Sequence, residues 1–154
     1  MGVAFKDRQP VRMVALVHEG APHELKRSFD ALVAWAGPKG LLQQSRHALA
    51  LYLTNMMTTA VADQRSYAGF ILEEGEVVTP EAPILEVTVP GGRHAMTLYR
   101  GPYAEIGAGW REVYAAIAAH GETPADQPPF EINLNNPRTT PPEDLLTEIW
   151  VPLA

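Results

Sequence analysis

The spacing of hydrophobic residues changes along the first half of the chain, from alternation to a helical period and back to alternation. Apolar and polar residues alternate over Val3–Asp7 and Arg12–His18, which predicts a hairpin of two strands closed by a turn at residues 8–10. A helical stripe follows, in which the spacing is i, i+4, i+7 and i+11: Leu25, Phe29, Leu32 and Ala36. Alternation then returns in two stretches near residues 49–54 and 67–72. The expected order is therefore hairpin, helix, strand and strand.

The second half repeats this pattern at an offset of 81 residues without a gap. Strands expected at 84–89 and 94–100 flank the turn Pro90-Gly91-Gly92, and the helical stripe returns at equivalent positions: Ile106, Trp110, Val113 and Ile117. Over the 62 aligned pairs there are 11 identities, whereas ordinary composition gives about one in sixteen by chance. Gly40 and Gly121 stand where a left-handed glycine would end each helix. The two repeats are expected at residues 3–72 and 84–153.

These elements predict an α+β fold made of a duplicated hairpin–helix–strand–strand unit. We expect about eight strands, with both helices on one face of the sheet and a ligand groove on the other. The alternating Leu49, Leu51 and Leu53, and their equivalents Phe130, Ile132 and Leu134, are expected to face the helices. Two similar halves side by side would leave the groove between them.

The opposite sheet face is then expected to carry carboxylates, amides and aromatic rings together. Its members in the alternation are these: Glu131, Glu148, Asn133, Trp150, Tyr52 and Tyr67. Aromatic walls with a few fixed polar groups are typical of small-molecule pockets. Glutamates on an exposed strand face are also commonly plain solvated carboxylates. A ligand-binding role for them therefore depends on the presence of the groove.

Composition and charge exclude several classes of function. The 154 residues include no cysteine, which excludes disulfides, thiolate metal sites and a cysteine nucleophile. A net charge of −6 argues against a nucleic-acid surface and favours cationic small molecules. No apolar run has the length of a membrane span, and no signal peptide is apparent, so we expect a cytoplasmic protein. The five histidines lack ligand spacing, so neither a metal nor another cofactor is expected.

Several strings in the second half resemble one known family. They are Tyr99-Arg-Gly-Pro-Tyr103, Trp110-Arg-Glu-Val-Tyr114, the segment 130–142 that begins Phe-Glu-Ile-Asn, and Thr147-Glu-Ile-Trp-Val-Pro-Leu153. In order and spacing they resemble the GyrI-like small-molecule-binding domain, and the likeness extends over residues 1–154 as a single domain. The family includes effector-binding domains of AraC-type and MerR-type multidrug-sensing regulators, a gyrase-inhibitory protein, and members that hydrolyse cyclopropane-bearing compounds.

The resemblance implies a ligand site with acidic residues at its centre and aromatic residues around it. By motif it assigns Glu131 and Glu148 as the acids, and it implies aromatic contacts at Trp110 and Tyr99. Trp110 also lies on the core stripe, where packing is the commoner role. Tyr99 stands at a strand end, where it can simply cap the sheet. No DNA-reading segment precedes residue 1, so we expect no direct binding of nucleic acid and no membrane binding.

Three functions remain open at this stage. The first is a module that binds a cationic or aromatic, xenobiotic-like compound in the groove between the repeats. The second is a hydrolase of strained electrophiles, in which Glu148 or Glu131 is the catalytic acid or base. The third is a protein-interaction role, for example with a regulator or with gyrase. The first two use the same residues, so the sequence leaves open whether the protein is an enzyme.

Overall fold

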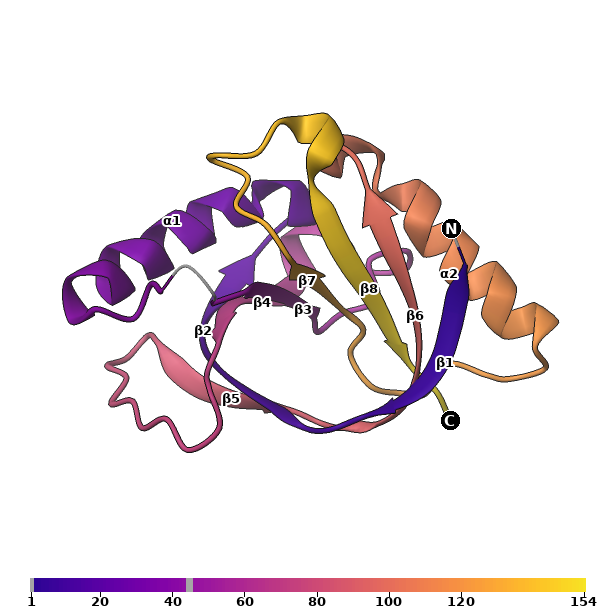
Figure 1. Cartoon of the computed structure of the whole chain (residues 1–154), viewed down its shortest axis with the longest axis horizontal. Coiled ribbons are helices and arrows are strands. Elements are labelled where there is room, and N and C mark those ends of the chain that lie inside the picture. Colours follow the sequence, from indigo (N-terminus) through magenta and orange to yellow (C-terminus); the bar gives the residue numbers. More distant parts are fainter. Residues whose placement is uncertain (1, 44–45) are drawn as a thin grey trace. The chain divides into compact units, whose positions relative to one another are not determined.

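The computed structural model describes residues 2–43 and 46–154, whose contacts divide the chain into two compact units. The α1 unit is Pro10–Pro90, and the α2 unit combines the residues up to Gln9 with Gly91–Ala154. The α1 unit contains β2 (Val11–Glu19), α1 (Leu25–Ala36), β3 (Ala48–Tyr52), β4 (Arg65–Ile71) and β5 (Leu85–Val89). The α2 unit contains β1 (Val3–Arg8), β6 (Gly92–Arg100), α2 (Gly107–Ala119), β7 (Phe130–Asn133) and β8 (Leu146–Pro152). The eight strands and two helices of the described residues (Figure 1) confirm the α+β fold class.

The element bounds recur at the offset found in the sequence. β2 and β6, and likewise β4 and β8, begin and end 81 residues apart, and short 3-10 helices precede α1 and α2 at the same offset, Pro22–Glu24 and Tyr103–Glu105. Gly40 and Gly121 both have positive φ angles, 69° and 78°, as expected for residues that end a helix. The shared residues therefore encode a shared backbone.

The pairing of the first strands corrects the expected hairpins. β1 pairs antiparallel with β6, from Val3 opposite Thr97 to Arg8 opposite Gly92, rather than with β2. β2 pairs instead with β5 and β4. Each expected hairpin is thus opened, and the first strand of one repeat completes the sheet that contains the second strand of the other. A local turn signal at residues 8–10 could not reveal this, because strand pairing depends on contacts distant in sequence.

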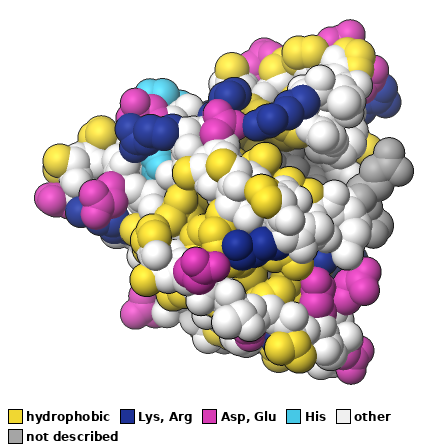
Figure 2. All heavy atoms as spheres, turned by 90° about the vertical axis from the view of Figure 1, so that its left-hand side faces the viewer, with side chains coloured by type: hydrophobic (Ala, Val, Ile, Leu, Met, Phe, Trp, Pro, Cys, Tyr) yellow, Lys and Arg dark blue, Asp and Glu magenta, His cyan; other side chains and the backbone are white. Residues whose placement is uncertain are grey.

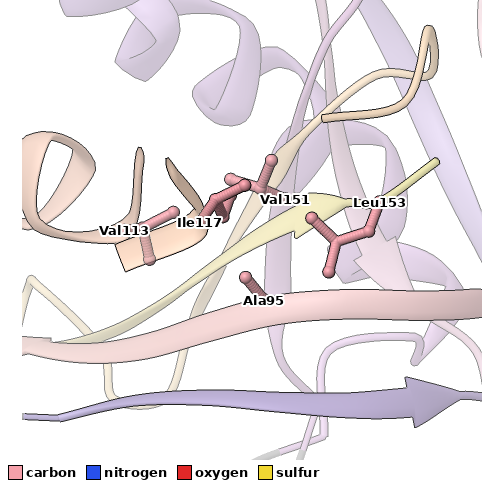
Figure 3. Packing of buried hydrophobic residues seen from close by; sticks show 5 residues of the cluster. All are labelled: Ala95, Val113, Ile117, Val151 and Leu153. Atoms are coloured by element: carbon pink, nitrogen blue, oxygen red, sulfur yellow. The ribbon is translucent and has the colours of Figure 1, made fainter. Parts of the chain in front are cut away.

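Each unit is a four-stranded antiparallel sheet with its helix packed on one face, here called the helix side; the other face is the far side. The strand order is β1-β6-β8-β7 in the α2 unit and β3-β4-β2-β5 in the α1 unit. In the α2 unit, the helix side buries Ala95, Val151 and Leu153 of the sheet against Val113 and Ile117 of α2 (Figure 3). In the α1 unit, Leu25 and Phe29 of α1 pack against Ala50 and Ala68.

The connection between the second strand and the helix is stabilised by different residues in the two units. In the α1 unit, the buried His18 ring contacts Ser28 Oγ at 2.7 Å through Nδ1 and the carbonyl of Ala21 at 2.9 Å through Nε2. The equivalent of His18 is Tyr99, whose hydroxyl donates to the carbonyl of Pro102 at 2.7 Å. At the equivalent of Ser28, which is Gly109, an added side chain would first meet Cδ1 of Ile149, at 2.7 Å, and then Cβ of Tyr99, at 3.3 Å. The strand residue that fills this space also differs between the copies: Ile149 in the α2 unit is equivalent to Ala68 in the α1 unit.

Among the described residues, no helix combines the length and the apolar character needed to cross a membrane.

Replacing Gly109 by alanine tests how closely α2 packs against the sheet at this position. The added Cβ would lie 2.7 Å from Cδ1 of the fully buried Ile149 and 3.3 Å from Cβ of Tyr99, neither of which can move freely. Overpacking of this kind costs about 1–3 kcal/mol, against up to about 1 kcal/mol gained from helix propensity. We expect the free energy of unfolding to fall by about 1–2 kcal/mol, measured by urea denaturation. Gly107→Ala is the control, because its Cβ would meet only the mobile end of Arg111 and should not destabilise the protein.

Candidate functional site

Glu131 lies on the helix side of the α2 unit. It stands opposite Ile149 in the β7–β8 register, and Ile149 packs against α2 at Gly109. The indole Nε1 of Trp110, on α2, donates to Oε2 of Glu131 at 2.6 Å. This charge-assisted hydrogen bond fixes the carboxylate against the helix. Both residues are only partly buried, so the pair is accessible from solvent.

Two further aromatic side chains accompany this pair. Tyr114, one helical turn after Trp110, has its ring roughly parallel to the indole, at 24° and with 6.2 Å between centroids. Tyr103, in the 3-10 helix before α2, lies within electrostatic reach of Glu131. Tyr103 and Tyr114 keep 37% and 41% of their surface exposed. The α2 unit therefore presents a carboxylate among three partly exposed aromatic rings, which we call the Glu131 cluster.

Part of each tyrosine is exposed and part is withdrawn from water, and this partial burial changes the pKa of both hydroxyls. Burial raises the pKa of the Tyr103 hydroxyl to about 12, and the negative charge of Glu131 adds to the shift. Burial alone raises the pKa of Tyr114. Both hydroxyls are neutral near pH 7, as at the ordinary pKa of 10.0, and the shifts extend this state to higher pH.

Tyr103 and Tyr114 were missed as site residues by the sequence analysis, although both belong to the strings that resemble the family. Their spacing contained a usable signal, because residues 103, 110 and 114 stand at i, i+7 and i+11 on one helical face. Their equivalents in the first repeat are Pro22 and Val33, which lack aromatic rings. Asn133 and Tyr99, both predicted as ligand-binding residues, also lie on the helix side, because each of them pairs with Thr147 of β8.

Glu148 and Trp150 lie on the far side of the same sheet. Trp150 stands opposite Phe130 in the register, with the two rings stacked at 11° and 6.2 Å between centroids. The indole Nε1 of Trp150 donates to Oε1 of Glu148 at 3.1 Å. Phe130 is fully buried and Trp150 is 4% exposed, so this face is an apolar core with one carboxylate at its margin.

A cation of the chain itself covers this far-side cluster. The guanidinium carbon of Arg8 lies 4.3 Å from the ring centroid of Trp150 and 5.3 Å from that of Phe130. Burial lowers the pKa of Arg8, and the charge of Glu148 partly offsets that effect. The sequence analysis did not single out Arg8, because only the pairing of β1 with β6 brings it to this face.

The prediction that Glu131 and Glu148 converge on one face is wrong. The register pairs Ile132, not Glu131, with Glu148, so the two carboxylates point to opposite sides of the sheet. The error lies in β7, where Phe130 and Ile132 were expected to face the helix. Both are buried on the far side instead, because that face also needs apolar residues around Trp150. The expected groove between the repeats stays a prediction.

Tyr52 and Tyr67 belong to the α1 unit and also lie on opposite sides of its sheet. Tyr52 packs on the helix side against the cluster of Leu25, Ala50 and Ala68. Tyr67 pairs with Leu51 and Val17, which places it on the far side. The expectation that Leu49 and Leu51 face the helix is therefore wrong for the same reason as in β7. A role of Tyr52 and Tyr67 in ligand binding stays a prediction.

In the described part of the chain, no group of three or more His, Asp or Glu side chains is placed to hold a metal ion. The groups present in the Glu131 cluster are a carboxylate, an indole N–H and two phenols.

The protein belongs to the GyrI-like family, because the family model for the GyrI-like small molecule binding domain matches residues 1–154. Among solved structures, the EcmrR C-terminal domain is similar in fold, with a TM-score of 0.78, 13% identity, and coverage of 99% of this chain and 97% of that one. SAV2435, solved bound to tetraphenylphosphonium, gives 0.65 at 17% identity, covering 100% and 94%. A hydrolase from Listeria innocua gives 0.70 at 12% identity, covering 99% and 91%.

The elevated pKa of Tyr103 gives a test of the cluster geometry. Because the folded pKa of about 12 exceeds the ordinary value of 10.0, the neutral phenol is favoured by folding. The stabilising effect is present below pH 10 and is lost as the pH rises towards 12. We expect 13C NMR of the tyrosine Cζ carbons to show a signal that titrates near pH 12 and disappears in Tyr103→Phe. In Glu131→Gln its pKa should fall but stay above 10.0, since burial is the larger cause. Titration of Tyr103 near pH 10 in the folded protein would contradict this placement.

Proposed function

We propose that this GyrI-like domain binds small organic cations with aromatic groups at the Glu131 cluster. The observation that carries the proposal is the Glu131 carboxylate, held by Trp110 at 2.6 Å beside the exposed rings of Tyr103 and Tyr114. A carboxylate attracts a cation by charge, and aromatic faces attract it through their quadrupoles. The net charge of −6 favours approach of the same class of ligand.

The differences between the repeats support this location. Glu131, Tyr103 and Trp110 replace Ala50, Pro22 and Phe29 of the first repeat, while the turns and helix ends are conserved between the copies. The acid and its polar aromatic neighbours are thus additions to one copy of a shared framework. The structure of SAV2435 with tetraphenylphosphonium, a cation with four aromatic rings, supports the same ligand class for a protein of similar fold.

Replacing Glu131 by glutamine tests the role of its charge. The variant keeps the shape and an oxygen that can accept from Trp110, but it removes the negative charge. We expect tetraphenylphosphonium binding, measured by calorimetry, to weaken by roughly 1–3 kcal/mol, the scale of the Coulombic attraction between a carboxylate and a cation about 5 Å apart at a partly exposed site. Binding of neutral triphenylphosphine oxide should change little. Glu148→Gln is the matched control, because Glu148 lies on the far side of the sheet beside Arg8.

Equal loss of affinity in the two variants would show that the cation does not bind at the Glu131 cluster. Unchanged affinity in both would favour the protein-interaction role. The hydrolase alternative depends on the same carboxylate, so hydrolysis of a cyclopropane-bearing electrophile is followed in parallel. If Glu131→Gln lowers the rate at saturating substrate much more than it weakens binding, Glu131 acts in the chemical step and the domain is an enzyme.

A further inference from the structure

The far side of the α2 unit contains a buried titratable group, the imidazole of His94 on β6. Histidine side chains also occur at the surface, where Figure 2 shows them in cyan, but His94 is only 1% exposed. Its ring lies edge-on to Phe130 and to Trp150, with 5.8 Å between centroids in both pairs. Arg8 covers the same two rings, so the imidazole and the guanidinium share one apolar surrounding.

The contacts of the His94 ring fix the position of its proton. Nδ1 lies 2.7 Å from the carbonyl oxygen of Gly92, and because a carbonyl only accepts, Nδ1 carries the proton and donates it. Nε2 is then the unprotonated nitrogen, and it is buried without a hydrogen-bond partner among the described residues. A second proton has to enter at Nε2, where the closed structure offers it no acceptor.

The surroundings of the ring favour its neutral form. Burial is the largest cause that lowers the pKa of His94, and the positive charge of Arg8 lowers it further. The carbonyl of Gly92 and the charge of Asp7 act in the opposite direction, but the net shift is downward. Geometry and charge therefore agree that His94 stays neutral while Arg8 is in place.

Two more charged groups lie at this face of the sheet. Lys6 stands opposite His94 in the β1–β6 register, and its ammonium lies 5.4 Å from the ring centroid of Trp150. Glu148 accepts the indole N–H of Trp150, and its charge acts on Arg8. The two cations that β1 brings to this face outnumber the one acid from β8. A further positive charge on His94 is therefore unfavourable as long as β1 is in place.

Detachment of β1 removes both obstacles to protonation of His94. In the strand order β1-β6-β8-β7, β1 is the edge strand, and Arg8 is its last residue. Strands near a chain terminus open with a lower free energy than the centre of a sheet. When β1 opens, the charges of Lys6 and Arg8 leave this face, and water can reach Nε2 of His94.

We propose that His94 and Arg8 form an acid-sensitive latch, in which protonation of His94 at Nε2 releases β1 from the sheet. While β1 is closed the ring stays neutral, whereas the released ring takes up a proton at its ordinary pKa of 6.5. The stabilisation of the closed state is therefore fully present above pH 6.5 and is lost as the pH falls below that value.

The latch reaches the helix side through another residue of the same strand. β1 also carries Phe5, which packs against Val113 and Ile117 of α2. Release of β1 in acid thus removes packing from the helix that carries Trp110. The latch does not depend on cation binding at the Glu131 cluster, so its failure would leave the proposed function untouched.

Amide hydrogen exchange of β1 tests the latch. We expect the opening constant of the β1 amides, corrected for the pH dependence of intrinsic exchange, to rise roughly eightfold from about pH 7 to about pH 5.5. This factor is the increase in proton uptake of a released imidazole with a pKa of 6.5. The amides of β8, which lies between β6 and β7, should keep their protection.

Three variants separate the latch from other effects of acid. His94→Asn keeps an N–H for the carbonyl of Gly92 but does not titrate in this range, so the acid dependence of β1 should disappear. Arg8→Met keeps an apolar chain over the rings and should weaken the dependence, because burial remains as the larger cause. His120→Asn is the matched control. His120 stacks on Phe5 of β1 at 4.1 Å but is exposed, so its loss should leave the acid dependence intact.

Three results would overturn the proposal. One is a Cε1 signal of His94 in 13C NMR that titrates near pH 6.5 while the β1 amides stay protected, because the closed structure would then accept the proton. Another is an unchanged acid dependence of β1 exchange in both His94→Asn and Arg8→Met, which would assign it to another group. The third is an equal rise in the exchange of β8, which would mean that acid unfolds the whole unit.

Discussion

The pairing of β1 with β6 is the constraint on which the α2 unit depends. Six residue pairs join the start of the chain to the second strand of the second repeat. Without β1, the sheet would lose an edge strand that also carries Phe5, which packs against the core around Val113 and Ile117. The unit that contains Glu131 is therefore assembled from two distant segments. This interdependence explains why the sequence repeats, 3–72 and 84–153, are not the compact units of the structure.

The duplicated framework leaves function to the positions where the copies differ. Turn and helix-end residues such as Gly40 and Gly121 keep the same backbone in both copies. Elsewhere, the local packing differs between the copies: Ile149 leaves no room for a side chain at Gly109, whereas Ser28 at the equivalent position contacts His18. The Glu131 carboxylate, by contrast, appears in one copy only, with Ala50 at the equivalent position of the other.

The elements of secondary structure could be predicted from the sequence, because they depend on local patterns. The orientation of strands whose two faces are both apolar could not. Strands, helices and the 81-residue offset follow from periodicity and glycine positions, and they are confirmed. The facing of β3 and β7 was wrong, because Phe130 and Ile132 are buried on the far side while Ala50 and Glu131 face the helices. Alternation identifies two faces of a strand but not which one a helix covers. Arg8 could not be found at all, since its place over Trp150 depends on a pairing between residues more than 80 positions apart.

The far side of the α2 unit shows how this sheet accommodates a cation among aromatic rings. Arg8 stacks on Trp150 at 4.3 Å, with the charge of Glu148 close enough to raise its pKa against the effect of burial. This cation is held by a strand, so a dissolved ligand competes poorly for the same rings. The Glu131 cluster combines the same elements, a carboxylate bound to an indole N–H beside a second ring, on a face reached by exposed Tyr103 and Tyr114. The two glutamates therefore differ in what each can bind: Glu148 balances a charge of the chain, whereas Glu131 lies where an external cation can approach.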